Sequence, residues 1–230
     1  MLPRVLEPEI MDSARDADEY DQMDHDVVNR TFVNDLLTFL VGADDPAGSK
    51  LDIGDILDVG TGTAQIPVEL GLRPQVQCRI VAVDLAASML DLAVYNLAAK
   101  GLESRVTLAQ ADAKQLHFDS GLFDIVISNS LIHHLPEPKL ALQEMLRVVR
   151  PQGAVFIRDL IRPVDQSELA RLVARHAGNE SEYSQRLLAD SLQAALTLDE
   201  VRSIVAELGF QVPTVQATSD RHWTWATRLR

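Results

Sequence analysis

The 230-residue chain has only one cysteine, so no disulfide within the chain can support the fold. Cys78 precedes the β-type run Arg79-Ile80-Val81, which is typical of a small buried thiol. Nothing in this pattern argues against a reducing compartment. Hydrophobic residues make up 47% of the sequence, which is enough for the core of one α/β domain with a modest extra element.

The chain also lacks the hydrophobic run of roughly 18 residues that a membrane span needs. Its first nine residues have neither the basic flank nor the apolar stretch of a signal peptide. Basic residues are scarce, with 21 Lys and Arg against 34 Asp and Glu and a net charge of −13. No run of Lys or Arg offers the basic face that nucleic acid or an anionic membrane requires. We therefore expect a cytoplasmic monomer or homodimer without nucleic-acid or membrane partners.

Strand and helix patterns alternate along most of the sequence. Apolar residues at helical spacing between Val28 and Leu40 predict a first helix that ends near Gly42. Apolar runs then predict buried strands at 53–59, 78–83, 105–109, 123–128 and 154–157, with helical patterns between most of them. This alternation predicts an α/β fold with a doubly wound, mostly parallel sheet and helices on both faces.

The C-terminal part departs from this alternation. Residues 165–195 predict two helices, the first of them capped by Asp165 and Glu168. A capping box of Thr197 and Glu200 then begins a further helix. The runs 210–217 and 222–229 predict a C-terminal antiparallel hairpin, which completes a seven-stranded, Rossmann-like sheet. We interpret residues 1–230 as one domain, with an N-terminal helical cap at 1–50 and a helical insertion at 165–195.

The turn Gly60-Thr61-Gly62 after the first strand has the features of a ligand site. Its two glycines let the backbone approach a ligand closely, although an ordinary strand–helix turn has the same composition. Asp58, Asp84 and Asp112 lie at the ends of three successive strands, and these ends meet at one edge of a parallel sheet. An acid at the position of Asp84 accepts both ribose hydroxyls of a nucleotide. The constellation therefore predicts a nucleotide-type ligand.

The charge of this turn disfavours a dinucleotide. The dinucleotide fingerprint needs a third glycine where the chain has Gln65. Asp58 beside the turn would also repel a pyrophosphate, whereas it would attract a ligand that carries an ammonium and a sulfonium. S-adenosyl-L-methionine (SAM) is such a ligand.

These segments resemble the motifs of class I SAM-dependent methyltransferases, most closely those of the quinone-biosynthesis-like branch with small-molecule substrates. The similar segments are Tyr20–Met23, Asp58–Ala64, Val81–Asp84, Ala111–Ala113, Phe123–Leu135 and Glu144–Gly153. Two positions depart from the family pattern. Ala64 stands where many members have a third glycine, and Gln152 replaces the more usual glycine after Pro151.

The resemblance implies SAM as the cofactor, S-adenosyl-L-homocysteine (SAH) as the product, and a role for each matching residue. Gly60, Thr61 and Gly62 would pass under the methionine part of SAM, and Asp58 would meet its ammonium, directly or through water. The residues implied around the nucleoside are Asp84 at the ribose, Leu85 and Met89 against the adenine, and Asp112 with Ala113 at its amino edge. Asn129 and Ser130 would line the cofactor, and Tyr20 and Arg30 would close over it.

Methyl transfer needs little catalytic machinery, because a sulfonium methyl is already activated and the transfer is an in-line displacement. A general base is needed only where the acceptor loses a proton. His133, His134 and Asp159 follow the fourth and fifth strands and are the candidates. Each also fits a structural role, since the histidines can fix the loop by hydrogen bonds and Asp159 can pair with Arg158 or Arg162.

The leading interpretation is methyl transfer from SAM to a small-molecule acceptor. The alternatives are a non-catalytic or regulatory SAM-binding module, a family member that uses SAM for other chemistry and, less favoured, an NAD-dependent oxidoreductase. No metal site is predicted, because His133 and His134 are adjacent rather than spaced as zinc ligands. The resemblance further implies that residues 165–195 form a lid over the substrate.

Overall fold

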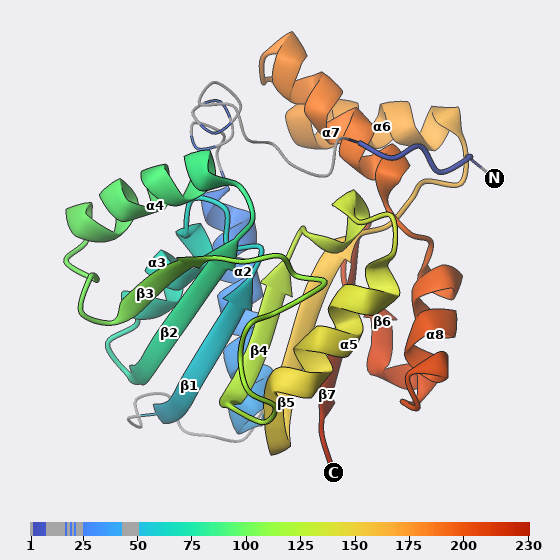
Figure 1. Ribbon diagram of the computed structural model, residues 1–230. Helices are drawn as coiled ribbons and strands as arrows, with labels where there is room; N and C mark the ends of the chain where they lie inside the picture. Colours follow the sequence, from blue (N-terminus) through green and yellow to red (C-terminus); the bar gives the residue numbers. More distant parts are fainter. Residues whose placement is uncertain (1, 8–16, 18, 20, 22–24, 43–50) are drawn as a thin grey trace.

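The computed structural model describes residues 2–7, 17, 19, 21, 25–42 and 51–230. These residues form one seven-stranded sheet with helices around it (Figure 1). The strand order is β3-β2-β1-β4-β5-β7-β6. The first five strands pair in parallel, whereas β7 lies antiparallel to both β5 and β6. This order confirms the predicted Rossmann-like α/β fold with its C-terminal antiparallel hairpin.

The elements of the described chain follow the alternation seen in the sequence. The strands are β1 (Leu51–Val59), β2 (Val76–Asp84), β3 (Val106–Gln110), β4 (Phe123–Asn129), β5 (Val149–Leu160), β6 (Val215–Ala217) and β7 (His222–Arg228). The helices are α2 (Asp26–Val41), α3 (Gln65–Gly71), α4 (Ala87–Ala99), α5 (Pro138–Val148), α6 (Gln166–Ala177), α7 (Glu182–Ala194) and α8 (Leu198–Glu207). Two short 3-10 turns are η1 (Ile132–His134) and η2 (Val212–Thr214).

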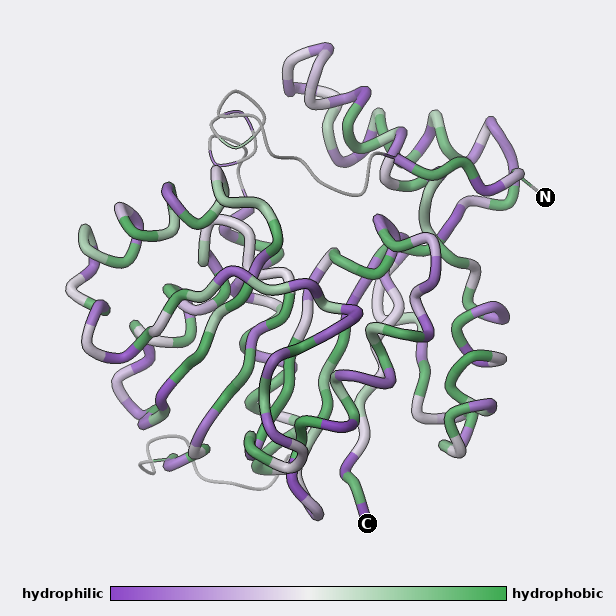
Figure 2. Tube along the Cα trace, viewed as in Figure 1, coloured by the Kyte–Doolittle hydropathy of each residue, from purple (hydrophilic) through white to green (hydrophobic). Residues whose placement is uncertain are grey.

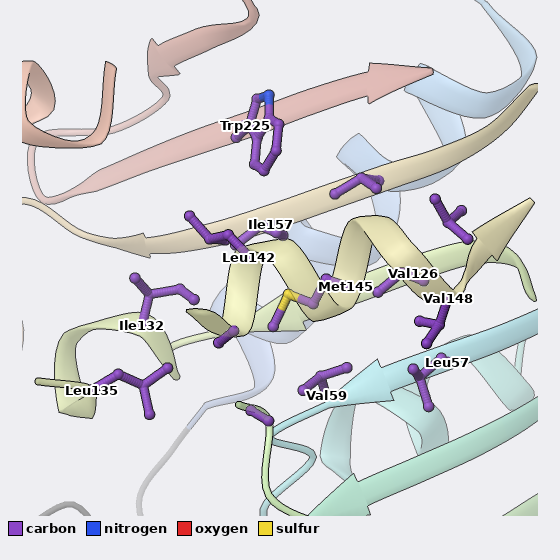
Figure 3. Packing of buried hydrophobic residues seen from close by; sticks show 14 of the residues in the cluster. Leu57, Val59, Val126, Ile132, Leu135, Leu142, Met145, Val148, Ile157 and Trp225 are labelled. Atoms are coloured by element: carbon purple, nitrogen blue, oxygen red, sulfur yellow. The ribbon is translucent and has the colours of Figure 1, made fainter. Parts of the chain in front are cut away.

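Helices cover both faces of the sheet because successive strand residues point to opposite sides. Ile56 packs with α2, α3 and α4 on one face, whereas its neighbour Leu57 packs with α5 and α8 on the other. Figure 3 shows Met145 of α5 and Trp225 of β7 within this second cluster. Hydrophobic residues accordingly concentrate along the central strands (Figure 2). No helix in the described ranges is both long and apolar enough to cross a membrane.

Helices α6 and α7 lie beyond the carboxyl ends of the strands, beside residues 2–7 (Figure 1). Leu2 is buried against Leu169 and Leu192 of these helices. Arg4 donates from Nε to the carbonyl of Ala194 (2.7 Å) and from Nη2 to the carbonyl of Leu135 (3.0 Å). Residues 2–7 therefore tie α7 to η1.

Two predicted strand boundaries are wrong. The predicted fifth strand starts at residue 154, after Pro151–Gly153. In the structure β5 already begins at Val149 and continues through Pro151–Gly153. Gln152 instead takes a left-handed conformation (φ 65°) where the register between β4 and β5 shifts. The extended run predicted at 210–217 contains the 3-10 turn η2 around Pro213, so β6 is reduced to Val215–Ala217.

Candidate functional site

The turn after β1 is fixed to β2 by its backbone. The N–H groups of Gly60 and Thr61 both donate to the carbonyl of Val83, at 2.9 Å each. Gly60 has a φ of 74°, and a Cβ added there would lie 2.9 Å from the Leu131 side chain, so both conformation and space require glycine. Ala64 also adopts a positive φ, 62°, which explains why a glycine suits this position.

Asp84 bridges the turn and the start of α4. Its Oδ2 accepts the N–H of Gly62 (2.8 Å), and its Oδ1 accepts the N–H of Ala86 (2.9 Å). These two bonds hold the carboxylate plane at the end of β2. A carboxylate oxygen has capacity for more than one hydrogen bond, so both oxygens remain able to accept a ligand hydroxyl.

Asp58 is buried at the end of β1, with 1% of its surface exposed. Thr61 Oγ1 donates to its Oδ2 at 2.7 Å. Burial raises the pKa of Asp58 to about 7, the hydrogen bond from Thr61 opposes this shift, and the charge of Asp84 adds to it. Since Asp58 forms no ion pair within the described residues, a cationic group bound nearby would favour its ionised form.

A cleft opens along the carboxyl edge of β1, β2 and β4. We call it the strand-edge cleft. Nine of the predicted cofactor residues line it, namely Gly60, Gly62, Asp84, Leu85, Met89, Asp112, Ala113, Asn129 and Ser130. Asp58 and Thr61 are buried beside its lining. Arg30 is exposed on α2 and is absent from the lining, so its role stays a prediction, and Tyr20 lies outside the described residues.

The end of β4 offers an unused acceptor to this cleft. Asn129 Oδ1 is buried and has no hydrogen-bond partner within the described chain. The next residue, Ser130, has a φ of 58°, and its N–H donates to the carbonyl of Arg158 at 2.9 Å. A buried acceptor without a partner is costly, so a ligand donor such as an ammonium would satisfy Asn129.

A second cavity adjoins the cleft, and we call it the histidine pocket. Five of the six histidines of the chain line it, namely His25, His133, His134, His176 and His222. Its apolar wall consists of Val28, Leu160, Ala177, Leu187 and Leu188. The cleft and the pocket share the lining residues Asn129, Ser130 and His134. A molecule in one cavity would therefore lie directly beside a molecule in the other.

His133 and Asp159 form a buried pair under this pocket. His133 Nδ1 lies 2.6 Å from Asp159 Oδ1, and the Asp159 carboxylate also accepts the backbone N–H groups of Ile132 and Leu160. Burial alone would lower the pKa of His133, but the charge and hydrogen bond of Asp159 raise it above its ordinary value. The pKa of Asp159 is lowered, because His133 and the backbone donors outweigh the effect of its burial.

The two predicted arginine partners of Asp159 are engaged elsewhere. Arg158 pairs with Asp35 of α2, and Arg162 pairs with Glu200 of α8. The alternative role for Asp159, pairing with Arg158 or Arg162, is therefore excluded. The partner of Asp159 is His133, so the carboxylate holds the imidazole in place and does not take part in a surface ion pair.

His134 differs from its neighbour although their rings lie 4.0 Å apart. Burial, with a contribution from the charge of His133, lowers the pKa of His134 to about 3. His134 is therefore neutral at physiological pH, and its Nδ1 is buried without a partner among the described residues. It can accept a hydrogen bond at the junction of the two cavities, but it is too weak a base to hold a proton.

Glu7 approaches the histidine pair and was missed by sequence reasoning, because no motif marks it. Its Oε1 lies 3.9 Å from His133 Nε2, and burial raises its pKa. Glu7, His133 and His134 place potential metal ligands within 4.8 Å of one another. The two imidazole rings are stacked, with centroids 4.0 Å apart and planes at 36°. That the chain has no metal site stays a prediction.

The chain is an α/β protein whose cleft lies at the carboxyl ends of its parallel strands, where such sheets bind ligands. Residues 57–157 match the family described as "Methyltransferase domain". The ubiquinone/menaquinone biosynthesis C-methyltransferase UbiE of Idiomarina loihiensis is 25% identical over 166 residues, which cover 68% of this chain and 66% of that protein. The demethylmenaquinone methyltransferase of Desulfitobacterium hafniense is 35% identical over 108 residues, covering 47% and 43%. The chain thus spans less than two thirds of these relatives' lengths.

Solved structures agree on the fold. A SAM-dependent methyltransferase from Aquifex aeolicus superposes with a TM-score of 0.68 at 16% identity, covering 95% of this chain and 99% of that one. The plantazolicin methyltransferase BamL, solved in complex with SAH, gives 0.67 at 16% identity, covering 92% and 88%. Residues 57–157 therefore match a methyltransferase domain, and the similar sequences support the predicted resemblance to class I SAM-dependent methyltransferases.

Proposed function

We propose that the protein transfers the methyl group of SAM to a small-molecule acceptor bound in the histidine pocket. The observation that supports this most directly is the shared border of the two cavities at Asn129, Ser130 and His134. In-line transfer requires two bound molecules in contact and alignment, and adjoining cavities supply that arrangement.

The residues of the strand-edge cleft fit the parts of SAM, which supplies an activated sulfonium methyl group when bound. Asp84 offers two fixed carboxylate oxygens to the ribose hydroxyls. Leu85 and Met89 line the cleft where an adenine would pack. At the other end, the partnerless Oδ1 of Asn129 and the buried carboxyl of Asp58 suit a cationic amino group.

His133 is the group best placed to take a proton from the acceptor. Asp159 binds its Nδ1, which leaves Nε2 as the reactive nitrogen and stabilises the imidazolium that forms. Despite its burial, His133 has a pKa raised above its ordinary value by Asp159, which makes it a stronger base than His134, whose pKa burial lowers to about 3. His134 would instead position the acceptor through Nδ1.

Helices α6 and α7 would act as the lid over the acceptor. Helix α7 contributes Leu187, Leu188 and Ser191 to the pocket lining, and α6 contributes Ala177. Residues 2–7 hold α7 against η1. Exclusion of water by such a cover protects the transfer reaction. The acidic net charge of −13 supports a cytoplasmic enzyme without a nucleic-acid partner, and a monomer or homodimer is proposed for its assembly.

Calorimetric titration with SAM, SAH and NAD tests the cofactor. We expect SAM and SAH to bind the wild type, and Asp84→Ala to weaken both at least about tenfold through the lost hydrogen bonds to the ribose. Asp91→Ala removes the same charge from an exposed position on α4 and should leave both affinities unchanged. Binding of NAD with no response to SAM would overturn the proposal.

Turnover is tested by SAH formation with a panel of phenol, amine and thiol acceptors. With an acceptor that must lose a proton, His133→Asn should lower kcat while leaving the Kd for SAM unchanged, because His133 lies outside the strand-edge cleft. Tight SAM binding without turnover of any acceptor would favour a non-catalytic SAM-binding module.

A further inference from the structure

The turn between β6 and β7 places Arg221 in the lining of the histidine pocket. Its guanidinium forms no hydrogen bond or ion pair with any residue that the structure describes. Its backbone N–H donates to Ser219 Oγ at 3.2 Å, and its carbonyl accepts the N–H of Ile161 at 2.8 Å. Burial lowers the pKa of Arg221, and the charge of Asp220 partly opposes this effect. A half-buried guanidinium without a partner is unfavourable by itself, which points to an anionic ligand.

The neighbouring carboxylate is already engaged. Asp220 accepts Arg175 Nη1 at 3.0 Å and His176 Nε2 at 3.1 Å, both from α6. Arg221 is the one guanidinium and Glu180 the one carboxylate in the described lining of the pocket. In a chain of net charge −13, Arg221 is therefore the group in this cavity that can attract an anion.

His222, the next residue, supplies a second donor. Ser219 Oγ accepts the N–H groups of Arg221 (3.2 Å) and His222 (3.0 Å), so its hydroxyl hydrogen is left to donate to His222 Nδ1 at 2.9 Å. The proton of the neutral ring must then sit on Nε2. Burial lowers the pKa of His222 to about 3, so the ring stays neutral and Nε2–H remains a donor at physiological pH.

From these contacts we infer that the pocket selects acceptors bearing a carboxylate, which Arg221 binds through its guanidinium and His222 assists through Nε2–H. The apolar wall of Leu160, Leu187 and Leu188 would hold the hydrophobic body of the same molecule. The acceptor class is thus a small, partly apolar organic acid. This inference rests on the proposed function, because it names the substrate class of the same site.

Paired probes that differ only in charge test the inference on the SAH-bound 230-residue chain. We would titrate 4-hydroxybenzoate and 1-hydroxy-2-naphthoate against their neutral amides, using wild type, Arg221→Gln, Arg221→Lys and Arg186→Gln. Arg186 is an exposed arginine on α7 outside the lining, so its variant controls for the loss of one positive charge. The binding of SAH is measured first for every protein and reports folding and the cofactor site.

We expect at least one carboxylate to bind about tenfold or more tightly than its amide in wild type and Arg186→Gln, as a charge-assisted bidentate contact provides. The ratio should fall to about one in Arg221→Gln and recover partly in Arg221→Lys, with unchanged SAH affinity. Equal binding of acid and amide to the wild type would overturn the inference. A ratio that survives in Arg221→Gln, or no binding of either acid at about 10 mM, would also overturn it. Failure of SAH to bind would instead refute the proposed function.

Discussion

The buried carboxyl of Asp58 should make protein stability and SAM affinity respond to pH in opposite directions. Its pKa is about 7 in the fold against an ordinary value of 3.8. The fold therefore prefers the protonated form, and the stability that this preference contributes is present below pH 3.8 and lost as the pH rises to about 7. At about 1.4 kcal/mol per pKa unit, ionisation of Asp58 above pH 7 costs the ligand-free protein roughly 4 kcal/mol.

Asp58→Asn removes this ionisation and keeps an acceptor for Thr61. At pH 8, we expect the ligand-free variant to be more stable than the wild type by about 2–4 kcal/mol in urea unfolding. SAM should bind it more weakly, because the ionised carboxyl attracts the ammonium. In the wild type, SAM affinity should fall about 20-fold between pH 7.5 and 5.5 as Asp58 becomes protonated, and the variant should lose this dependence.

Asp91→Asn, at an exposed position, is the matched control and should change neither property. The reasoning would be refuted if Asp58→Asn were less stable than the wild type at pH 8. It would also be refuted if wild-type affinity for SAM stayed constant between pH 5.5 and 7.5. Either result would mean that the Asp58 carboxylate is already stabilised in the ligand-free protein.

Three further substitutions test the backbone and the core. Gln152→Gly should stabilise the protein by about 0.5–1 kcal/mol in urea unfolding, because Gln152 is exposed and its φ of 65° suits glycine. A lower stability of the variant would contradict this prediction. Gly60→Ala should weaken SAH binding at least about tenfold, because its Cβ would collide with Leu131. Gly121→Ala is the control, since Gly121 also has a positive φ but its Cβ would meet nothing closer than 3.8 Å, and it should leave SAH binding intact. Equal effects of the two substitutions would disprove the collision as the cause. Met145→Ala, at a fully buried position, should cost about 2–5 kcal/mol, against less than about 1 kcal/mol for Leu140→Ala at 41% exposure.

The sequence was sufficient to predict the strand-edge cleft, since it depends on local chemistry at strand ends. Glycines at 60 and 62 and acids at 84 and 112 lie where a parallel sheet collects them at one edge. The paired roles of His133 and Asp159 were harder to assign. Both residues were predicted as candidates, but their 2.6 Å contact depends on the pairing of β4 with β5, which the sequence does not state.

Residues that reach the site by tertiary packing were missed. Arg221 and His222 arrive through the β6–β7 turn, far along the chain from the loop after β4 that carries His133. Glu7 arrives because Leu2 and Arg4 fasten the N-terminal segment to α7 and η1. No periodicity or motif signals such contacts, because they depend on packing between distant segments. The unusual start of β5 escaped prediction for a different reason, since Pro151 normally marks a break and here begins a bulge.

The position of β7 has a consequence for the order in which the sheet assembles. β7 lies between β5 and β6 although it follows both in the sequence, and β6 pairs with β7 alone. The loop between β6 and β7 is short, so closing this hairpin loses little chain entropy, whereas pairing β7 with β5 joins segments some 70 residues apart. We therefore expect the hairpin to form before it docks on β5 as one unit, and this docking would bring Arg221 and His222 to the histidine pocket.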